Sequence, residues 1–213
     1  YHAGAGDDYA YLSSSAAFTG SAQIIPNGTT TIELKANLTT TNENNHNFIM
    51  YAFHSVTGYS KFGSYTGNAN ATGPSVTLGF APAWILIKNA SASENWYIWD
   101  NTREPAPAQK NKRLHPNLNV VEQTSTGRSI TFTATGFQVT DTDSSVNGNG
   151  NTFIYAAFAD TRSAAFFKDV TTNGNHFTPV NLDYRDSVPD TPTNSFATFN
   201  PLNSPAAAVL SEG

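Results

Sequence analysis

The sequence has no cysteine and few charged residues. The lack of cysteine excludes disulfides, thiolate metal ligands and cysteine nucleophiles. Charged residues make up 13% of the 213 residues, which is about half of the usual share. The net charge of -5 argues against nucleic acid as a partner, because nucleic-acid binding requires a basic face that neutralises phosphates. No apolar stretch is long enough to span a bilayer, so we expect no membrane insertion.

The composition favours short β-strands joined by polar turns. Hydrophobic residues make up 38% of the chain and aromatic residues 12%, which is sufficient for a packed core. Threonine and asparagine are abundant in place of charged residues. Threonine suits a β-strand and asparagine tolerates turn geometry. Almost no segment has the apolar spacing of a helix, so the sequence predicts an all-β protein.

One segment occurs twice. Residues 47–53 (NFIMYAF) recur as residues 152–158 (TFIYAAF), and each copy follows an asparagine-rich turn. The residues matched at one common offset are Phe48, Ile49, Ala52 and Phe53. An offset of roughly a hundred residues is the size of a small β domain. The duplication predicts a modular structural protein in which this segment is a strand of each module.

The stretch between the two copies predicts an antiparallel β-sandwich of about seven strands. Its apolar run 84–88 is expected to be buried on both faces, and a polar turn joins it to 95–100 in a hairpin. Residues 103–126 contain several prolines and are interpreted as a long connection. The expected strands are 64–68, 75–78, 84–88, 95–100, 128–134, 137–140 and the second copy of the repeated segment.

Two segments alternate between apolar and polar residues. Residues 128–134 alternate and then turn into 137–140, which predicts a second hairpin. Residues 30–36 alternate before the first copy, which predicts a half-buried strand. The residues expected on the inward faces are Ile130, Phe132 and Ala134 in one strand, and Ile32, Leu34 and Ala36 in the other.

Aromatic and basic residues form two candidate sites. Aromatic rings at 96–99 could stack on sugars, and Tyr97 and Trp99, which share one face of a strand, are the possible glycan contacts. We favour core packing for these rings. The basic residues of 103–113 are interpreted as charges of a solvated loop.

No pattern of metal ligands or catalytic residues is evident. The five histidines (2, 46, 54, 115 and 176) lack metal-ligand spacing and are interpreted as turn or surface residues. Calcium sites can be built from turns such as those flanked by Asp141 and Asp143, or by Asp183, Asp186 and Asp190, but this spacing is generic. Nucleophile-elbow, phosphate-loop and zinc-protease patterns are missing. We expect no enzyme activity, no cofactor and no metal site.

Several runs of the sequence form a recognisable series. The longest, 51–68 (YAFHSVTGYSKFGSYTGN), has the character of a junction between two modules. The others are 79–88 (GFAPAWILIK), 96–100 (WYIWD), 112–114 (KRL), 136–137 (GF), 155–159 (YAAFA) and 190–202 (DTPTNSFATFNPL). Over about residues 47–213 the series resembles a module of tail-fibre and tail-tip proteins of tailed bacteriophages, especially marine phages. Residues 190–202 resemble the start of a lectin-like sandwich module that often follows.

The resemblance implies a place in the virion and a role in host attachment, with no catalytic residues. It implies other virion proteins as partners, a homotrimer, and contact with host surface glycan as a possibility. The expected parts are 1–60, the end of a preceding repeat with its junction; 61–161, a complete sandwich; and 162–213, a connector and the start of a following module. Both ends are expected to continue. The alternatives are a carbohydrate-binding or polysaccharide-degrading module and a bacterial surface adhesin repeat.

Overall fold

The computed structural model describes residues 8–20, 24–26 (backbone only), 32–34, 41–104, 109–124 and 127–159. In these residues the chain is almost entirely β, as expected, and all strand pairings are antiparallel. The contact pattern separates residues 1–160 from residues 161–213. The second part, with Asp183, Asp186, Asp190 and the predicted following module, lies outside the described residues. The three predicted boundaries stay predictions.

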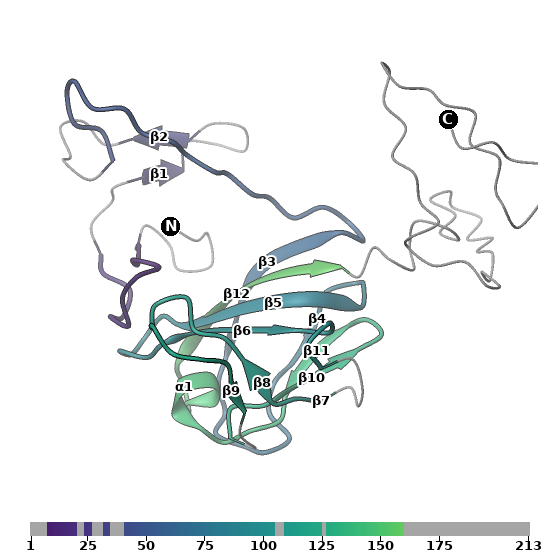
Figure 1. Cartoon of the computed structure of the whole chain (residues 1–213). Helices are drawn as coiled ribbons and strands as arrows, with labels where there is room; N and C mark the ends of the chain where they lie inside the picture. The colour runs from purple at the N-terminus through teal and green to yellow at the C-terminus, as the bar shows by residue number, and fades with distance from the viewer. Residues whose placement is uncertain are drawn as a thin grey trace, which may run out of the picture. The chain divides into compact units, whose positions relative to one another are not determined.

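Two four-stranded sheets form a sandwich in the described residues (Figure 1). The first sheet has the order β3 (Ser60–Thr66), β12 (Thr152–Ala159), β5 (Pro82–Asn89) and β6 (Trp96–Asp100). The second has the order β4 (Ser75–Thr77), β11 (Gly136–Val139), β10 (Ile130–Thr133) and β7 (Gln109–Lys110). The two predicted hairpins are confirmed as β5–β6 and β10–β11.

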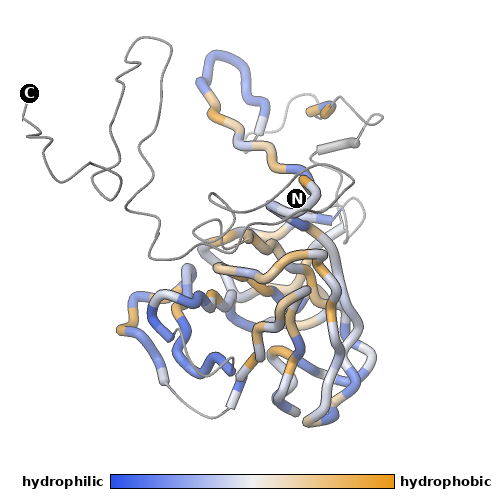
Figure 2. Tube along the Cα trace, turned by 90° about the vertical axis from the view of Figure 1, so that its right-hand side faces the viewer, coloured by the Kyte–Doolittle hydropathy of each residue, from blue (hydrophilic) through white to orange (hydrophobic). Residues whose placement is uncertain are grey.

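The core lies between the two sheets because apolar residues alternate along the strands. The first sheet contributes Tyr65, Ile85, Ile87, Tyr97, Trp99, Phe153, Tyr155 and Ala157, and the second Ile130, Phe132, Phe137 and Val139. Hydrophobic stretches, in orange, run through the sandwich, and a mainly hydrophilic stretch, in blue, lies at its lower left edge (Figure 2). Burial of each large side chain stabilises the fold by about 1.5–3 kcal/mol. Gly63 is required opposite Tyr155, since a Cβ there would lie 2.6 Å from the tyrosine hydroxyl.

Several predictions about the sandwich need correction. Ala134 is exposed, because it lies in the turn after β10 rather than in the strand. The run 84–88 is fully buried on the core side, whereas on its other side Trp84 and Leu86 are half-buried and Lys88 is buried. The connection 103–126 contains β7 and a two-stranded ladder of β8 (Lys112–Arg113) and β9 (Gln123–Thr124). One helical turn, α1 (Ser144–Asn147), precedes β12.

The residues before the sandwich form a hairpin and an extended segment. Strands β1 (Ile24–Pro26) and β2 (Ile32–Leu34) pair with each other. Ile32 and Leu34 are exposed, so the expected half-buried strand is wrong in its burial. Residues 47–53, the first copy of the repeated segment, form no strand, although the second copy is the central strand β12. The prediction that both copies form strands is therefore wrong for the first copy, whereas the second copy pairs with β3 and β5.

Candidate functional site

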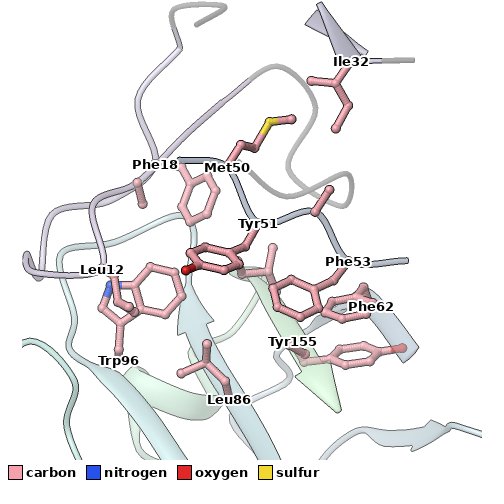
Figure 3. Close-up of a pocket in the computed structure, with 14 residues that line it drawn as sticks. Leu12, Phe18, Ile32, Met50, Tyr51, Phe53, Phe62, Leu86, Trp96 and Tyr155 are labelled. Carbon is pink, nitrogen blue, oxygen red and sulfur yellow. The ribbon is translucent and has the colours of Figure 1, made fainter. Parts of the chain in front are cut away.

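An apolar hollow lies on the outer face of the first sheet. The outward residues Phe62, Leu86, Trp96, Ile154 and Ala156 contribute to its lining, and the hollow has a volume of about 410 Å³. Figure 3 shows Tyr51 and Phe53 projecting from the 50–53 segment over this face, with Leu12 and Phe18 at one side. Every lining side chain except the tyrosines and tryptophan is wholly apolar. The lining offers apolar surface and shape to a ligand and no charged group.

The segment 8–20 is attached to the sandwich beside this hollow. The indole Nε1 of Trp96 donates to the carbonyl oxygens of Tyr11 and Ser14, both at 3.1 Å. The backbone N–H of Phe18 donates to Ala90 O at 3.0 Å. These bonds fix the segment along the end of β5 and the start of β6, where one wall of the hollow is formed.

Lys88 is the buried cation that secures this attachment. Its Nζ donates to Asn89 O at 2.7 Å, Ser15 O at 3.2 Å and Ala92 O at 3.3 Å. Burial lowers the pKa of Lys88 from 10.5 to about 8, and the nearby charge of Glu94 opposes this shift only in part. Three carbonyl oxygens replace the hydration of the ammonium group, which is how a buried lysine keeps its hydrogen bonds. This role cannot be predicted from the local pattern, because Lys88 ends an apolar run like the polar end of a strand.

The first copy of the repeated segment forms the other side of the hollow. Ile49 and Tyr51 are 83% and 79% exposed. Phe53 lies over the outer face, with its ring centroid 6.0 Å from that of Phe62 and 6.2 Å from that of Phe158. Several exposed apolar side chains in succession make this segment a candidate interaction surface.

The junction between this segment and β3 is a hydrogen-bonded turn. Val56 N–H donates to Ser60 O at 2.9 Å, and Ser60 N–H donates to Val56 O at 3.0 Å. Ser60 Oγ donates to His54 O at 3.0 Å, and Phe62 N–H donates to Ser55 Oγ at 3.1 Å. Gly58 takes the positive φ of 74° that the turn needs. The repeated segment therefore enters β3 through a closed turn rather than through a flexible linker.

The interpretation of 103–113 as a solvated loop is wrong for two of its four basic residues. Lys110 is buried, with its Nζ donating to Glu104 O and lying 5.2 Å from the Phe132 ring centroid. Arg113 is also buried, and its Nη1 donates to Gly127 O at 3.1 Å. These cations hold the connection against the second sheet. No period-two alternation marks these two residues in the sequence, because Lys110 and Arg113 are three positions apart.

Arg103 forms the half-buried part of the same cluster. Its Nε lies 2.6 Å from Asp100 Oδ2, and its Nη1 lies 3.0 Å from Glu122 Oε2. The two carboxylates come from β6 and from the loop before β9, so the guanidinium joins parts of the chain that are far apart in sequence. The cluster is structural, since its charges are satisfied by one another.

Tyr97 and Trp99 lie in the core. They are 1% and 0% exposed, and their rings stack with centroids 5.6 Å apart. Neither ring face is open to a sugar, so the suggested glycan contact through these residues is corrected in favour of core packing. Trp96 on the opposite face of β6 is the ring that borders the hollow.

The remaining candidates also have structural roles. His115 is buried, contrary to the expected surface position; its Nδ1 lies 3.1 Å from Trp96 O and its Nε2 lies 3.0 Å from Gln123 Oε1. Asp143 caps α1 through Ser145 N–H at 2.9 Å and lies 3.2 Å from Arg128 Nη2. Burial alone would raise the pKa of Asp143, but the Ser145 hydrogen bonds and the Arg128 charge outweigh it and lower the pKa.

The described residues contain neither a cluster of metal ligands nor a membrane-spanning helix. No three histidine, cysteine, aspartate or glutamate side chains there gather closely enough to hold a metal ion. No helix in that part of the chain has the length and apolar character to cross a bilayer.

The fold and the hollow define an all-β sandwich domain with an apolar outer sheet face. The family model described as "Domain of unknown function (DUF7483)" matches residues 1–162, and the chain belongs to this family. No curated protein and no solved structure matches the chain.

Proposed function

We propose that the chain is a non-enzymatic structural module of a phage virion, in a tail fibre or tail-tip protein. There it spaces or presents the parts that bind the host receptor. The observation that carries this proposal is the junction at 51–68, where the series that resembles phage fibre modules begins. The copied segment passes into β3 through the closed turn at Val56–Ser60, and such a turn suits a chain of linked modules.

The packing of the sandwich supports a structural role. The side chains considered as candidate sites have structural roles. Tyr97 and Trp99 lie in the core, Asp143 caps α1, and Arg113 donates a hydrogen bond to a backbone carbonyl oxygen. Other virion proteins are the proposed partners, and a homotrimer is the proposed assembly.

Immunogold electron microscopy of purified particles tests the location. Antibodies against folded chain are applied to phage particles from a culture that carries the gene, and mass spectrometry of the same particles is run in parallel. We expect gold on the tail and peptides of this chain in the particle. Absence of the chain from particles, with labelling of the bacterial envelope instead, would overturn the proposal in favour of a surface adhesin.

A further inference from the structure

The hairpin β1–β2 corresponds to the hairpin β10–β11 of the complete sandwich. In one hairpin Ile24 pairs with Leu34, and in the other Ile130 pairs with Val139. From Leu34 to Phe48 is 14 positions (48 − 34), and from Val139 to Phe153 is also 14 positions (153 − 139). The N-terminal part thus repeats both the hairpin and its spacing to the copied strand, which is more than a chance match of one short segment.

The complete sandwich shows where these elements belong. There the hairpin lies in one sheet, and β12 lies in the other between β3 and β5. Phe153 is 0% exposed and stacks on Tyr65 with ring centroids 4.9 Å apart. Its counterpart Phe48 is 46% exposed and has no strand partner. The N-terminal elements match the last third of a sandwich in their order and spacing. The described residues contain no second set of the other strands.

We propose that residues 24–53 are the last third of a second sandwich, and that 47–53 inserts as its central strand. The partner of this strand is a chain segment equivalent to residues 60–106, from a sandwich of the same family. The strands of that segment that are equivalent to β3 and β5 flank 47–53 on its two sides. Phe48 then stacks on the residue equivalent to Tyr65. This inference deepens the proposed function by naming the partner of each module, and it rests on the modular arrangement proposed above.

The sandwich of this same chain does not serve as the acceptor. Its position between β3 and β5 is already filled by β12, with backbone pairing along both sides from Phe153 to Phe158. The acceptor therefore has an open central position, which only an incomplete sandwich offers. Insertion would bury the exposed side chains of Phe48 and Met50, whose counterparts Phe153 and Tyr155 lie in the core, and satisfy the backbone groups of the segment from both sides.

An extended chain supplies the missing segment for a direct test. The two hairpins begin 106 positions apart (130 − 24), so a copy of residues 60–106 placed before Tyr1 completes one further repeat. Hydrogen–deuterium exchange of 47–53 is measured by mass spectrometry in the original and the extended chain. We expect exchange in 47–53 to slow by about 100-fold or more in the extended chain, as for the core of a folded sheet.

A matched control carries Ile85→Asp and Ile87→Asp in the added copy alone. Both positions are fully buried in the complete sandwich, so this copy cannot form a sheet and 47–53 should stay unprotected. Fast exchange in both extended chains would overturn the proposal. Protection of 47–53 in the original chain, together with a dimer in sedimentation, would also overturn it, because the occupant would then be a second copy of this chain.

A second variant tests strand equivalence even if the extended chain fails to fold. Tyr155→Met with Ala156→Tyr gives β12 the sequence of the first copy from Phe153 to Phe158. We expect the variant to unfold cooperatively with a lowered Tm, whereas the control Ala157→Asp loses cooperative unfolding. Loss of cooperative unfolding in the double variant would overturn the equivalence. Both tests use the purified chain, whereas the virion proposal is tested on phage particles. Failure of this inference can therefore be distinguished from failure of the proposed function.

Discussion

Replacing the same residue in the two copies of the repeated segment should have very different effects. Phe153 is fully buried in β12 and stacks on Tyr65 at 4.9 Å, whereas Phe48 is 46% exposed. Removal of a buried phenylalanine ring costs about 3–5 kcal/mol, and loss of the stacked pair adds about 0.5–1.5 kcal/mol. We therefore expect Phe153→Ala to lower the free energy of unfolding by about 4 kcal/mol, and Phe48→Ala by less than about 0.5 kcal/mol.

Urea unfolding followed by tryptophan fluorescence measures both variants. Trp99 lies in the core between the sheets, so its emission reports on the sandwich itself. The ratio of the two effects is the decisive quantity, because both variants remove the same atoms. A cost below about 1 kcal/mol for Phe153→Ala, or equal costs for the two variants, would refute the assignment of one copy as core and the other as surface.

Three further predictions concern the attachment of 8–20 and the loops. Trp96→Phe removes the N–H that donates to Tyr11 O and Ser14 O. Proteolysis within 8–20 should then become faster, while the Tm of the sandwich changes little. An unchanged proteolysis rate would contradict the attachment. The pKa of Lys88 is about 8 in the folded chain and 10.5 in the unfolded chain, so the unfolded chain binds more protons between these two pH values. The free energy of unfolding should therefore rise with pH in this range, by at most about 1.4 kcal/mol per pH unit. Lys88→Met should lack this rise, and parallel pH profiles of the two chains would contradict the buried position of the ammonium group. Asn147→Ala leaves Asn68 N–H and the carbonyl oxygens of Asn70 and Asp141 without their partner. We expect the free energy of unfolding, measured in urea, to fall by about 3 kcal/mol. A fall of less than about 1 kcal/mol would show that these groups find other partners.

Sequence patterns predicted the sandwich well where local signals agreed. The hairpins β5–β6 and β10–β11 each combine an apolar run with a polar or glycine-containing turn. The alternation in β6 correctly separated Tyr97 and Trp99 from Trp96. These features are set by a period of two and by turn residues, both of which can be recognised in one sequence.

Features that depend on distant contacts could not be predicted. Lys110 and Arg113 look like solvated charges, and their burial follows from the packing of the connection against the second sheet. Lys88 looks like the polar end of a strand, and its role depends on the carbonyl oxygen of Ser15 far away in the sequence. The hollow likewise requires the outer face of one sheet and the segment 50–53 together. Long-range packing overrides local pattern at each of these places.

The positions where the chain enters and leaves the sandwich affect what a module of this kind can do. Entry and exit lie side by side, since Ser60 pairs with Phe158, and Ala159 N–H donates to Tyr59 O at 2.7 Å. The loops at the opposite end of these strands are joined to one another, with Gly67 N–H donating to Asn151 O at 2.9 Å and Ala90 N–H to Thr152 O at 2.9 Å. Because the chain enters and leaves at the same end of the sandwich, the module adds little distance between the segments that precede and follow it. We infer that such a module presents the loops of its other end more than it spaces its neighbours, and the Asn147 hydrogen bonds keep those loops in a fixed arrangement for contact.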